Sequence, residues 1–230
     1  MAAIKGGKLA LGAVLMASFI AVMVAIFLPL IDGHNSLDYL DNLYNSISKD
    51  SANYFEKVHH LVEEHQGEQV RLTLKMESAG DAETAATLLE GPASSVSVNG
   101  SEVAVEGGFD TMLEQCLADA EAMYNNEGAG LSSRYGMPER EALYGWWKVL
   151  GAMEKDFNRQ KLFAAAKVTD SLKKKAVECA YNYYGIEPQS ISERWGIVLF
   201  SLIFYVVYTI WYGYAVMFLF EGLGYELGSH

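Results

Sequence analysis

Two long apolar runs stand out in the pattern of hydrophobic and polar positions along this chain. Residues 9–31 and residues 196–220 contain no charged side chain. A helix needs about 20 predominantly apolar residues to cross the hydrocarbon core of a bilayer. Within lipid, a single segment satisfies its backbone hydrogen bonds only as a helix. The pattern therefore predicts transmembrane helices at 9–31 and 195–220.

A cleaved signal peptide is the alternative for the first run. The run is longer than the roughly 7 to 15 apolar residues of a signal peptide. It also ends in the sequence FLPLI, without a small-x-small cleavage site. We therefore expect an uncleaved anchor after a tail of residues 1–8, and a second tail over 221–230.

The segment after the first run repeats its apolar residues at alternating steps of three and four. The repeat runs through Leu37, Leu40, Tyr44, Ile47, Ser51, Tyr54, Val58, Leu61 and His65. Such a heptad seam is typical of a helix that packs along its whole length. We predict one continuous helix over 36–65 within a stalk of residues 32–67. Its partner would be either another chain or a later helix of this one.

The period changes to two in the unit of residues 68–127. Residues 70–76 alternate apolar and polar side chains, which predicts a half-buried strand. A short alanine-rich helix follows, and then two strands around Asn99-Gly100, a strong hairpin signal that tolerates positive φ at both positions. An amphipathic helix over 109–124 completes the order β-α-β-β-α. This order is most of a ferredoxin-like unit, a fold that hosts many unrelated functions.

The pattern of residues 128–194 predicts a helical return segment, which leads the chain back to the second apolar run. The Gly-, Ser- and Asn-rich stretch 125–136 predicts a loop. A helical pattern then continues to Tyr184, where Gly185 stops it, with a break expected between residues 158 and 170. Together the elements predict a membrane α+β protein. Two transmembrane helices would flank one extracytoplasmic domain made of a helical stalk or bundle and the ferredoxin-like unit.

The basic residues near the apolar runs predict the orientation. Lys5 and Lys8 precede the first run, whereas acidic residues such as Asp38 follow it. Lys and Arg remain on the cytoplasmic side, and the first helix usually dominates, although Arg194 before the second run opposes this orientation. We expect a bacterial inner-membrane protein with both termini in the cytoplasm and residues 32–194 outside.

The charge and the motifs limit the classes of function. The chain carries a formal net charge of −12, whereas a nucleic-acid-binding protein carries a basic patch. HExxH, GxSxG, Walker and Gly-rich dinucleotide motifs are all missing from the sequence. We therefore expect no nucleic-acid partner, no catalytic activity and no cofactor.

Two sets of residues could still carry local chemistry. Glu56 and His59 form one Glu-x-x-His unit, and Glu63 lies one turn further, but di-iron bundles need a second such unit. We expect a solvated, charged helix face there and keep the three residues as candidate metal ligands. Cys116 and Cys179 are the only cysteines. They could form a disulfide in an oxidising compartment or be two small buried hydrophobic residues.

The transmembrane segments carry the features on which the functional expectation depends. Small residues recur every fourth position in the first segment, at Ala13, Ala17, Ala21 and Ala25. Such a ridge lets another helix approach closely. The second segment carries a polar stripe of Ser201, Tyr205, Tyr208, Thr209 and Tyr212. A tyrosine hydroxyl at mid-depth needs a partner that lipid tails do not offer, so the stripe favours helix packing over contact with a quinone or haem.

We therefore expect a non-catalytic accessory or scaffold subunit of a multi-subunit membrane complex, with a respiratory or electron-transfer complex as the host. Its partners would be the lipid bilayer and other membrane subunits, which it would contact through both transmembrane helices. A membrane-anchored periplasmic sensor or ligand-binding module is the alternative, and an apolar pocket with a few convergent polar groups would favour it.

Overall fold

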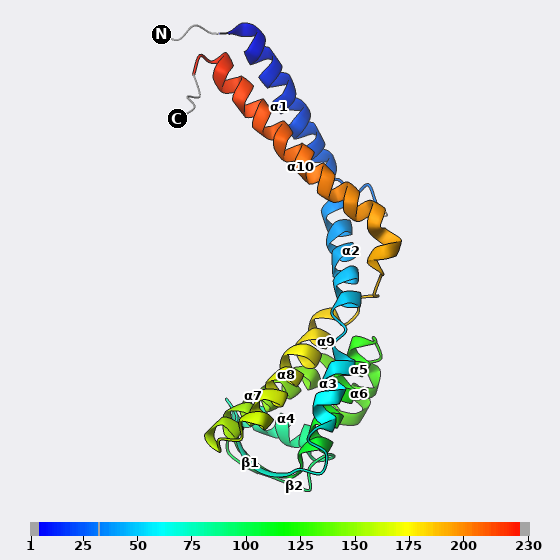
Figure 1. The fold of residues 1–230 in the computed structure, drawn as a ribbon, viewed down its shortest axis with the longest axis vertical. Coiled ribbons are helices and arrows are strands. Elements are labelled where there is room, and N and C mark those ends of the chain that lie inside the picture. Colours follow the sequence, from blue (N-terminus) through cyan, green and yellow to red (C-terminus); the bar gives the residue numbers. More distant parts are fainter. Residues whose placement is uncertain (1–4, 32, 226–230) are drawn as a thin grey trace. The chain divides into compact units, whose positions relative to one another are not determined.

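The computed structural model describes residues 5–31 and 33–225 (Figure 1). The chain forms two compact units, Met1–Asp50 with Pro188–His230, and Ser51–Glu187. The first unit contains α1 (Gly6–Phe27), α2 (Ser36–Ser51) and α10 (Ile191–Gly222). The second unit contains α3 (Phe55–Glu63), β1 (Gln69–Lys75), α4 (Ala79–Leu89), β2 (Ser95–Asn99), β3 (Glu102–Gly108), α5 (Phe109–Tyr124), α6 (Ala129–Tyr135), α7 (Glu139–Arg159), α8 (Phe163–Leu172), the π-helix η1 (Lys173–Val177) and α9 (Glu178–Tyr183).

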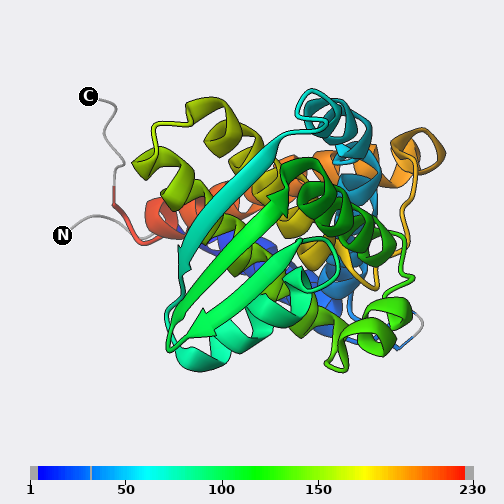
Figure 2. The same ribbon diagram turned by 90° about the horizontal axis from the view of Figure 1, so that it is seen from below.

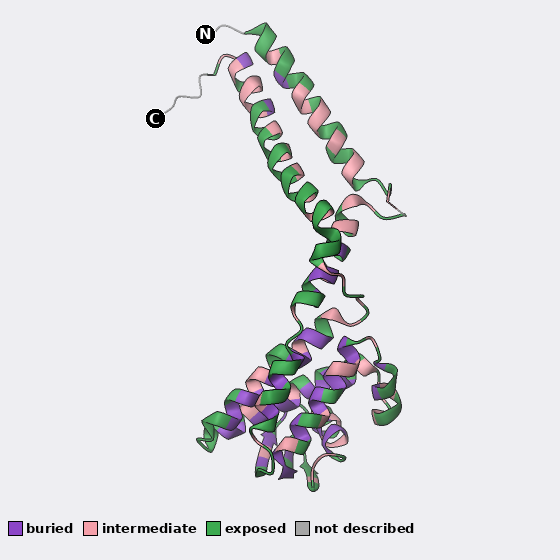
Figure 3. Cartoon of the chain, turned by 45° about the vertical axis from the view of Figure 1, so that its right-hand side comes forward, coloured by how far each residue is buried: buried purple, intermediate pink, exposed green. Residues whose placement is uncertain are grey.

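Helices α1 and α10 are both long and apolar enough to cross a membrane. Gly12, Ala215 and Gly222 are the only buried residues in these two helices, and their surfaces are otherwise exposed or intermediate (Figure 3). The core helix of a soluble protein would be buried, whereas these helices present apolar side chains outward, as a helix in lipid does. The chain thus has two candidate membrane-spanning helices.

The ends of these two helices differ from the predicted bounds. α1 ends at Phe27, four residues before the apolar run does, because Pro29 forces the preceding Leu28 into an extended conformation (φ −76°, ψ 143°). α10 begins at Ile191, where the Ser190 side chain accepts a hydrogen bond from the Ser192 amide. Apolarity locates such a helix, whereas proline and capping residues decide where it ends.

Helices α1 and α10 pack closely at the end where the chain enters α1 and leaves α10. A Cβ atom added to Gly12 would lie 2.6 Å from the Leu219 backbone nitrogen, and one added to Gly222 would lie 2.5 Å from the Leu9 Cα. Only glycine permits this approach of two backbones. Lys8 Nζ also lies 2.5 Å from a carboxylate oxygen of Glu221.

The predicted continuous helix over 36–65 is wrong, because α2 ends at Ser51 and α3 begins at Phe55. The Asn53 side chain accepts a hydrogen bond from the Phe55 amide at 3.3 Å. Asparagine makes such local bonds in competition with the helical ladder. The Ala52 carbonyl accepts a hydrogen bond from the Cys179 thiol, also at 3.3 Å.

A three-stranded antiparallel sheet in the order β1-β3-β2 lies in the second unit (Figure 2). One face of the sheet is buried, because Leu72 of β1 pairs with Val105 of β3, and both side chains point into the core. The other face is polar and carries the cross-strand pair Arg71–Glu106, with 2.8 Å between the charged atoms. The order β-α-β-β-α is present as predicted. The ferredoxin-like assignment stays a prediction, since the described residues supply only three strands.

The outer edge of β1 is protected by a side chain of α7 and by that of Gln160, which follows α7. Asp156 accepts a hydrogen bond from the Thr73 amide at 3.1 Å, and Gln160 donates one to the Arg71 carbonyl at 3.0 Å. An unpaired strand edge otherwise invites another strand to pair with it. Asp156 is buried and also bonds to Arg159 and Gln160, so α7 is fixed in register against the sheet.

The turns in the second unit differ from the predictions at two places. The hairpin forms, but Asn99 pairs with Glu102, so Gly100 and Ser101 are the turn residues. Gly100 has φ +61°, whereas Asn99 stays in the strand and does not adopt a positive φ. The predicted loop over 125–136 contains the short helix α6, because Leu131 is buried and anchors it to the core.

The helical return contains α7, α8, η1 and α9. The break predicted between residues 158 and 170 lies at Gln160–Leu162, where Lys161 adopts φ +63°. Gly185 has φ +86°, just after the end of α9, as its place in the sequence predicted. The core of the unit lies between these helices, α3, α5 and the buried face of the sheet, and its largest fully buried apolar side chains include Trp146, Phe109, Phe157, Leu72, Leu74 and Leu88.

Candidate functional site

The site with the most unusual backbone is the groove between α7 and the continuous helix formed by α8, η1 and α9. Lys173–Val177 is a π-helix, and single π turns inside α-helices are rare and frequent at functional sites. In an α-helix, residues five apart are about 140° apart around the axis. A π turn closes with a hydrogen bond between residues i and i+5, so Lys173 and Glu178 come to nearly the same side.

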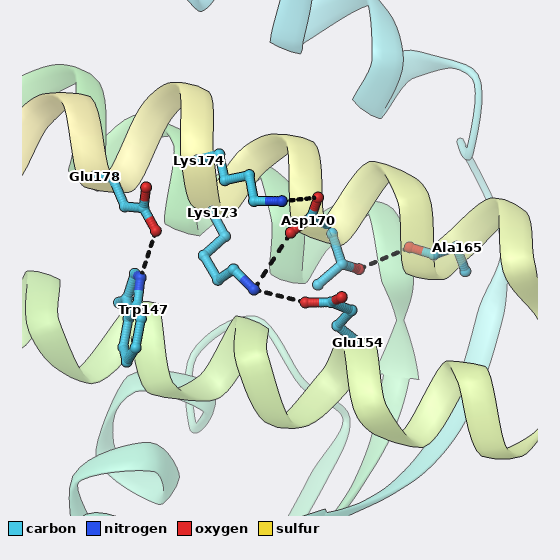
Figure 4. Close-up of polar contacts among 8 residues, drawn as sticks. Trp147, Glu154, Ala165, Asp170, Lys173, Lys174 and Glu178 are labelled. Carbon is cyan, nitrogen blue, oxygen red and sulfur yellow. Dashed lines mark hydrogen bonds and ion pairs between the residues drawn. The ribbon is translucent and has the colours of Figure 1, made fainter.

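Figure 4 shows the result of this π turn. Lys173 and Glu178 both point toward α7. Glu178 accepts a hydrogen bond from the Trp147 indole nitrogen at 2.8 Å, and Lys173 donates one to Glu154 at 2.6 Å. The π turn therefore lets Glu178 and Lys173 of one helix bind two different residues of α7.

The Lys173 ammonium group is a fixed charge in this groove. Its side chain is 13% exposed and lies between Glu154 at 2.6 Å and Asp170 at 3.4 Å. Burial alone would lower the pKa of Lys173, but the hydrogen bond to Glu154 and the two ion pairs outweigh burial and raise the pKa above its usual value. Lys174 pairs with Asp170 at 2.8 Å and lowers the pKa of that carboxyl.

One hollow of the groove is aromatic. It has a volume of about 310 Å³, and its lining residues are Leu143, Tyr144, Trp147, Val177, Glu178, Tyr181 and Asn182. The rings of Tyr144 and Trp147 stack with 5.8 Å between their centroids and 11° between their planes. Aromatic walls with one carboxylate and one amide are the composition expected of a small-molecule site. We refer to these residues as the aromatic hollow.

A second hollow also includes Trp147 in its lining and is rich in lysine. It has a volume of about 220 Å³, and its lining residues are Lys75, Met76, Glu77, Trp147, Lys148, Gly151, Ala152, Glu154, Lys155 and Lys173. We refer to them as the lysine hollow. Trp147 lines both hollows, so the two adjoin at this residue.

Two of the exposed aromatic rings already have a positively charged side chain of this chain lying over them. Lys148 Nζ lies 4.7 Å from the centroid of the Tyr144 ring, and the Arg140 guanidinium lies 5.4 Å from that of Tyr181. Lys148 also pairs with Asp81 at 2.7 Å. The hydrogen bond to Asp81 raises the pKa of Lys148 and lowers that of Asp81. These contacts show that the face of α7 beside the groove already accommodates positive charge by cation–π interaction.

No residue of this groove was among the sites expected from the sequence. Trp146 and Trp147 are adjacent, so they point about 100° apart around a helix, and they cannot both face the core. Trp146 is fully buried, whereas Trp147 is 38% exposed. The adjacent tryptophans were therefore a usable signal, but the π turn that brings Glu178 to Trp147 has no recognisable sequence pattern.

The candidate metal ligands do not converge. His59 Nε2 lies 3.3 Å from a carboxylate oxygen of Glu121, while Glu63 pairs with the neighbouring His60. Glu56 is exposed. Within residues 5–31 and 33–225, no three His, Cys, Asp or Glu side chains are grouped so that they could hold a metal ion.

The two cysteines are both buried, and the disulfide considered from the sequence is not formed in the structure. Cys116 lies in α5 and is fully buried, and burial, together with the nearby Asp119 carboxylate, raises the pKa of its thiol. Cys179 lies in α9. Both behave as small core residues.

The residues predicted for helix packing lie on different sides of the pair of helices α1 and α10. Ala13, Ala17 and Ala21 are exposed, and Ala25 is partly buried. In the stripe of α10, Tyr208 and Ser201 are partly buried, whereas Tyr205, Thr209 and Tyr212 are exposed.

Three polar groups of that stripe, those of Tyr208, Ser201 and Thr209, have different neighbours. The Tyr208 hydroxyl lies 3.4 Å from the Phe19 carbonyl oxygen, and Ser201 Oγ lies 2.6 Å from the Tyr44 hydroxyl of α2. Thr209 donates to the Tyr205 carbonyl one turn before it at 2.8 Å.

A buried carboxylate network was also invisible in the sequence. Asp119 of α5 accepts hydrogen bonds from Trp146 at 2.9 Å, Tyr135 at 2.5 Å, Arg134 at 2.5 Å and Gln115 at 3.0 Å. Burial and the bond to Asp119 raise the pKa of Tyr135. Four donors satisfy the carboxylate and join α5, α6 and α7, which is a structural arrangement rather than a reactive one.

The chain matches no known protein-family model, no curated protein sequence and no solved structure. The class of protein that the structure itself defines is a mostly helical chain with two candidate membrane-spanning helices and a small antiparallel sheet.

Proposed function

We propose that this chain is a non-catalytic accessory or scaffold subunit of a bacterial inner-membrane complex. Helices α1 and α10 would anchor it and bind neighbouring membrane subunits. The globular unit Ser51–Glu187 would lie on the extracytoplasmic side with both chain termini in the cytoplasm, as the distribution of Lys5 and Lys8 before α1 favours.

The observation that carries this proposal is the free small-residue face of α1. Contacts with α10 are made by Gly12 and Phe19. Ala17 and Ala21 are exposed and lie on the opposite side of the helix, by the 100° turn per residue. Small residues drive helix association in lipid because they let backbones approach closely. The ridge is therefore available to a helix of another subunit.

The proposal is tested by filling the ridge. Ala17→Leu and Ala21→Leu keep the surface apolar but block close approach, so they should reduce recovery of partner subunits from mild-detergent extracts by at least tenfold. Val207→Leu is the matched control, because Val207 is 54% exposed on α10 and outside the predicted stripe. Undiminished recovery in both alanine variants, or a wild-type chain that purifies alone, would reject the accessory-subunit role.

A second candidate role is a membrane-anchored ligand-binding module. The aromatic hollow favours it, because Tyr144, Trp147 and Tyr181 surround a single carboxylate in a concave site. This role does not exclude membrane partners, and binding measurements on the purified chain test it separately from the pull-down.

A further inference from the structure

The lysine hollow and the aromatic hollow, which both include Trp147, differ in which charged side chains have a partner of opposite charge. In the lysine hollow, Lys75 pairs with Glu102, Lys148 pairs with Asp81, and Lys173 pairs with Glu154 and Asp170. Lys155 is exposed and makes no ion pair with any residue that the structure describes. Lys155 is therefore the one lysine of this hollow that is not neutralised by an ion pair with a described residue, and Glu77 is the carboxylate of the lining that has no such pair.

The charged residue of the aromatic hollow is Glu178. Glu178 accepts the indole hydrogen bond of Trp147 through Oε1. Among residues 5–31 and 33–225, no Lys, Arg or His is paired with Glu178. Its second oxygen can accept further bonds, and the half-exposed rings of Tyr144 and Tyr181 lie beside it. One negative charge in an aromatic setting is complementary to an ammonium group.

We propose that this groove binds a small linear zwitterion across Trp147. Its ammonium group would lie beside Glu178 in the aromatic hollow, and its carboxylate would lie beside Lys155 in the lysine hollow. An apolar linker between the two charges would pack on the Trp147 indole. This ligand class deepens the ligand-binding role and rests on it, but it needs no membrane partner.

The spacing of the residues sets the length of the ligand. Trp147 and Lys155 are eight residues apart on α7, which corresponds to about 12 Å along the helix axis. The long flexible side chain of Lys155 shortens the distance that the ligand must cover. A linker of several methylene groups fits this span, whereas the charges of an α-amino acid are too close together to reach both ends.

The groove also explains why a zwitterion is favoured over a simple cation or anion. Arg140 lies over the Tyr181 ring beside the aromatic hollow and repels an ammonium group that brings no negative charge. Glu77 lines the lysine hollow and repels a lone carboxylate. A ligand that carries both charges is attracted at each end. An ion with a single charge gains only one of these attractions and is still repelled by the like charge nearby.

The test is isothermal titration calorimetry of the full chain in an uncharged maltoside detergent at neutral pH. The probe is ε-aminocaproate, and its single-charge counterparts are n-hexylamine and caproate. We expect saturable binding of ε-aminocaproate at least tenfold tighter than that of either counterpart, and weaker binding of glycine because its charges are too close.

Substitutions then assign each end of the ligand. Glu178→Gln should weaken ε-aminocaproate and n-hexylamine by at least tenfold and leave caproate unchanged. Lys155→Gln should weaken ε-aminocaproate and caproate but not n-hexylamine. Lys167→Gln is the control, since Lys167 is exposed on α8 and lines neither hollow. All three side chains are at least partly solvent-exposed, so the melting temperatures should stay close to that of the wild type.

Several results would overturn the proposal. It fails if ε-aminocaproate gives no saturable heat, if caproate or n-hexylamine binds as tightly, or if Glu178→Gln or Lys155→Gln binds ε-aminocaproate like the wild type. Tighter binding of glycerophosphoethanolamine, whose two charges are closer together, would assign the groove to a lipid headgroup and reject the linear ligand. None of these results affects the pull-down that tests the accessory-subunit role.

Discussion

The ring of Tyr208 in α10 stacks on the ring of Phe19 in α1, with 4.2 Å between the centroids and 18° between the planes. The Tyr208 hydroxyl also lies 3.4 Å from the Phe19 carbonyl oxygen. A polar group deep in an apolar helix thus has its neighbour on the other helix of the same chain. Tyr208 therefore belongs to the contact that holds the hairpin together, while the ridge at Ala17 and Ala21 belongs to the free face.

Replacing Tyr208 and Gly12 should separate polar from steric contributions to the hairpin. Tyr208→Phe keeps the stacked ring and removes a long hydrogen bond, so it should cost about 0.6 kcal/mol or less. Gly12→Val places side-chain atoms against the Leu219 backbone and should disrupt the hairpin far more. The measurement is the concentration of denaturing detergent that separates α1 from α10. The readout is the yield of a disulfide crosslink between two cysteines engineered into the two helices. Equal loss in both variants would show that the glycine contact does not hold the helices.

Replacing Asp119 should strongly destabilise the globular unit. Asp119→Ala leaves the buried Trp146 indole N–H and the partly buried Tyr135 hydroxyl without their acceptor, and unsatisfied buried groups cost about 1–3 kcal/mol each. We expect a loss of roughly 3 kcal/mol in the free energy of unfolding. Chemical denaturation followed by tryptophan fluorescence measures this loss.

The matched control for Asp119 is Glu114→Gln, because Glu114 is an exposed carboxylate of the same helix and should change stability by less than about 0.5 kcal/mol. A similar small effect for Asp119→Ala would mean that its four hydrogen bonds contribute nothing net to the fold.

Placing a charge at Val58 should show that α3 belongs to the core of the globular unit. Val58 is fully buried, so Val58→Asp buries an unpaired carboxylate and should cost several kcal/mol, roughly 3 or more. Lys57→Asp changes an exposed neighbour on the same helix and should be nearly neutral. Thermal melting of both variants provides the comparison, and indistinguishable melting temperatures would contradict the packing of α3.

The Asp81–Lys148 ion pair should contribute a stability that depends on pH. The hydrogen bond from Lys148 lowers the pKa of Asp81 below 3.8 in the folded state. The contribution is therefore fully present above pH 3.8 and is lost as the pH falls through the lower folded value. The raised pKa of Lys148 means that the pair persists at least up to pH 10.5.

The measurement is the difference in melting temperature between the wild type and Asp81→Asn across this pH range. The difference should be constant at neutral pH and should shrink in acid, where both proteins carry a neutral group at position 81. A difference that grows on acidification would show that the carboxylate is not stabilised in the folded state.

Helices, strands and breaks could be predicted from the sequence where a single short-range pattern of residues determines them. The alternating residues of β1 follow from periodicity, and the stop at Gly185 follows from the backbone preference of glycine. The break at Lys161 lies inside the predicted window of 158–170, but no local pattern indicated a positive φ at that lysine. The continuous stalk helix was predicted wrongly, because the heptad pattern carries on past Asn53 while the local hydrogen bond to the Phe55 amide ends the ladder there. Periodicity reports which positions are apolar and does not report whether the backbone between them remains helical.

The sequence by itself determined that two apolar helices enclose a domain with a β-α-β-β-α order, because apolar length and residue period act within a few turns of chain. Only the tertiary structure decided which side of α1 meets α10, since Gly12 is one small residue among several until Leu219 lies against it. The groove at Trp147 is likewise tertiary. It requires a π turn near residue 175 and α7 on the facing side, and the residues that it joins, Trp147 and Glu178, are separated by two helices in the chain.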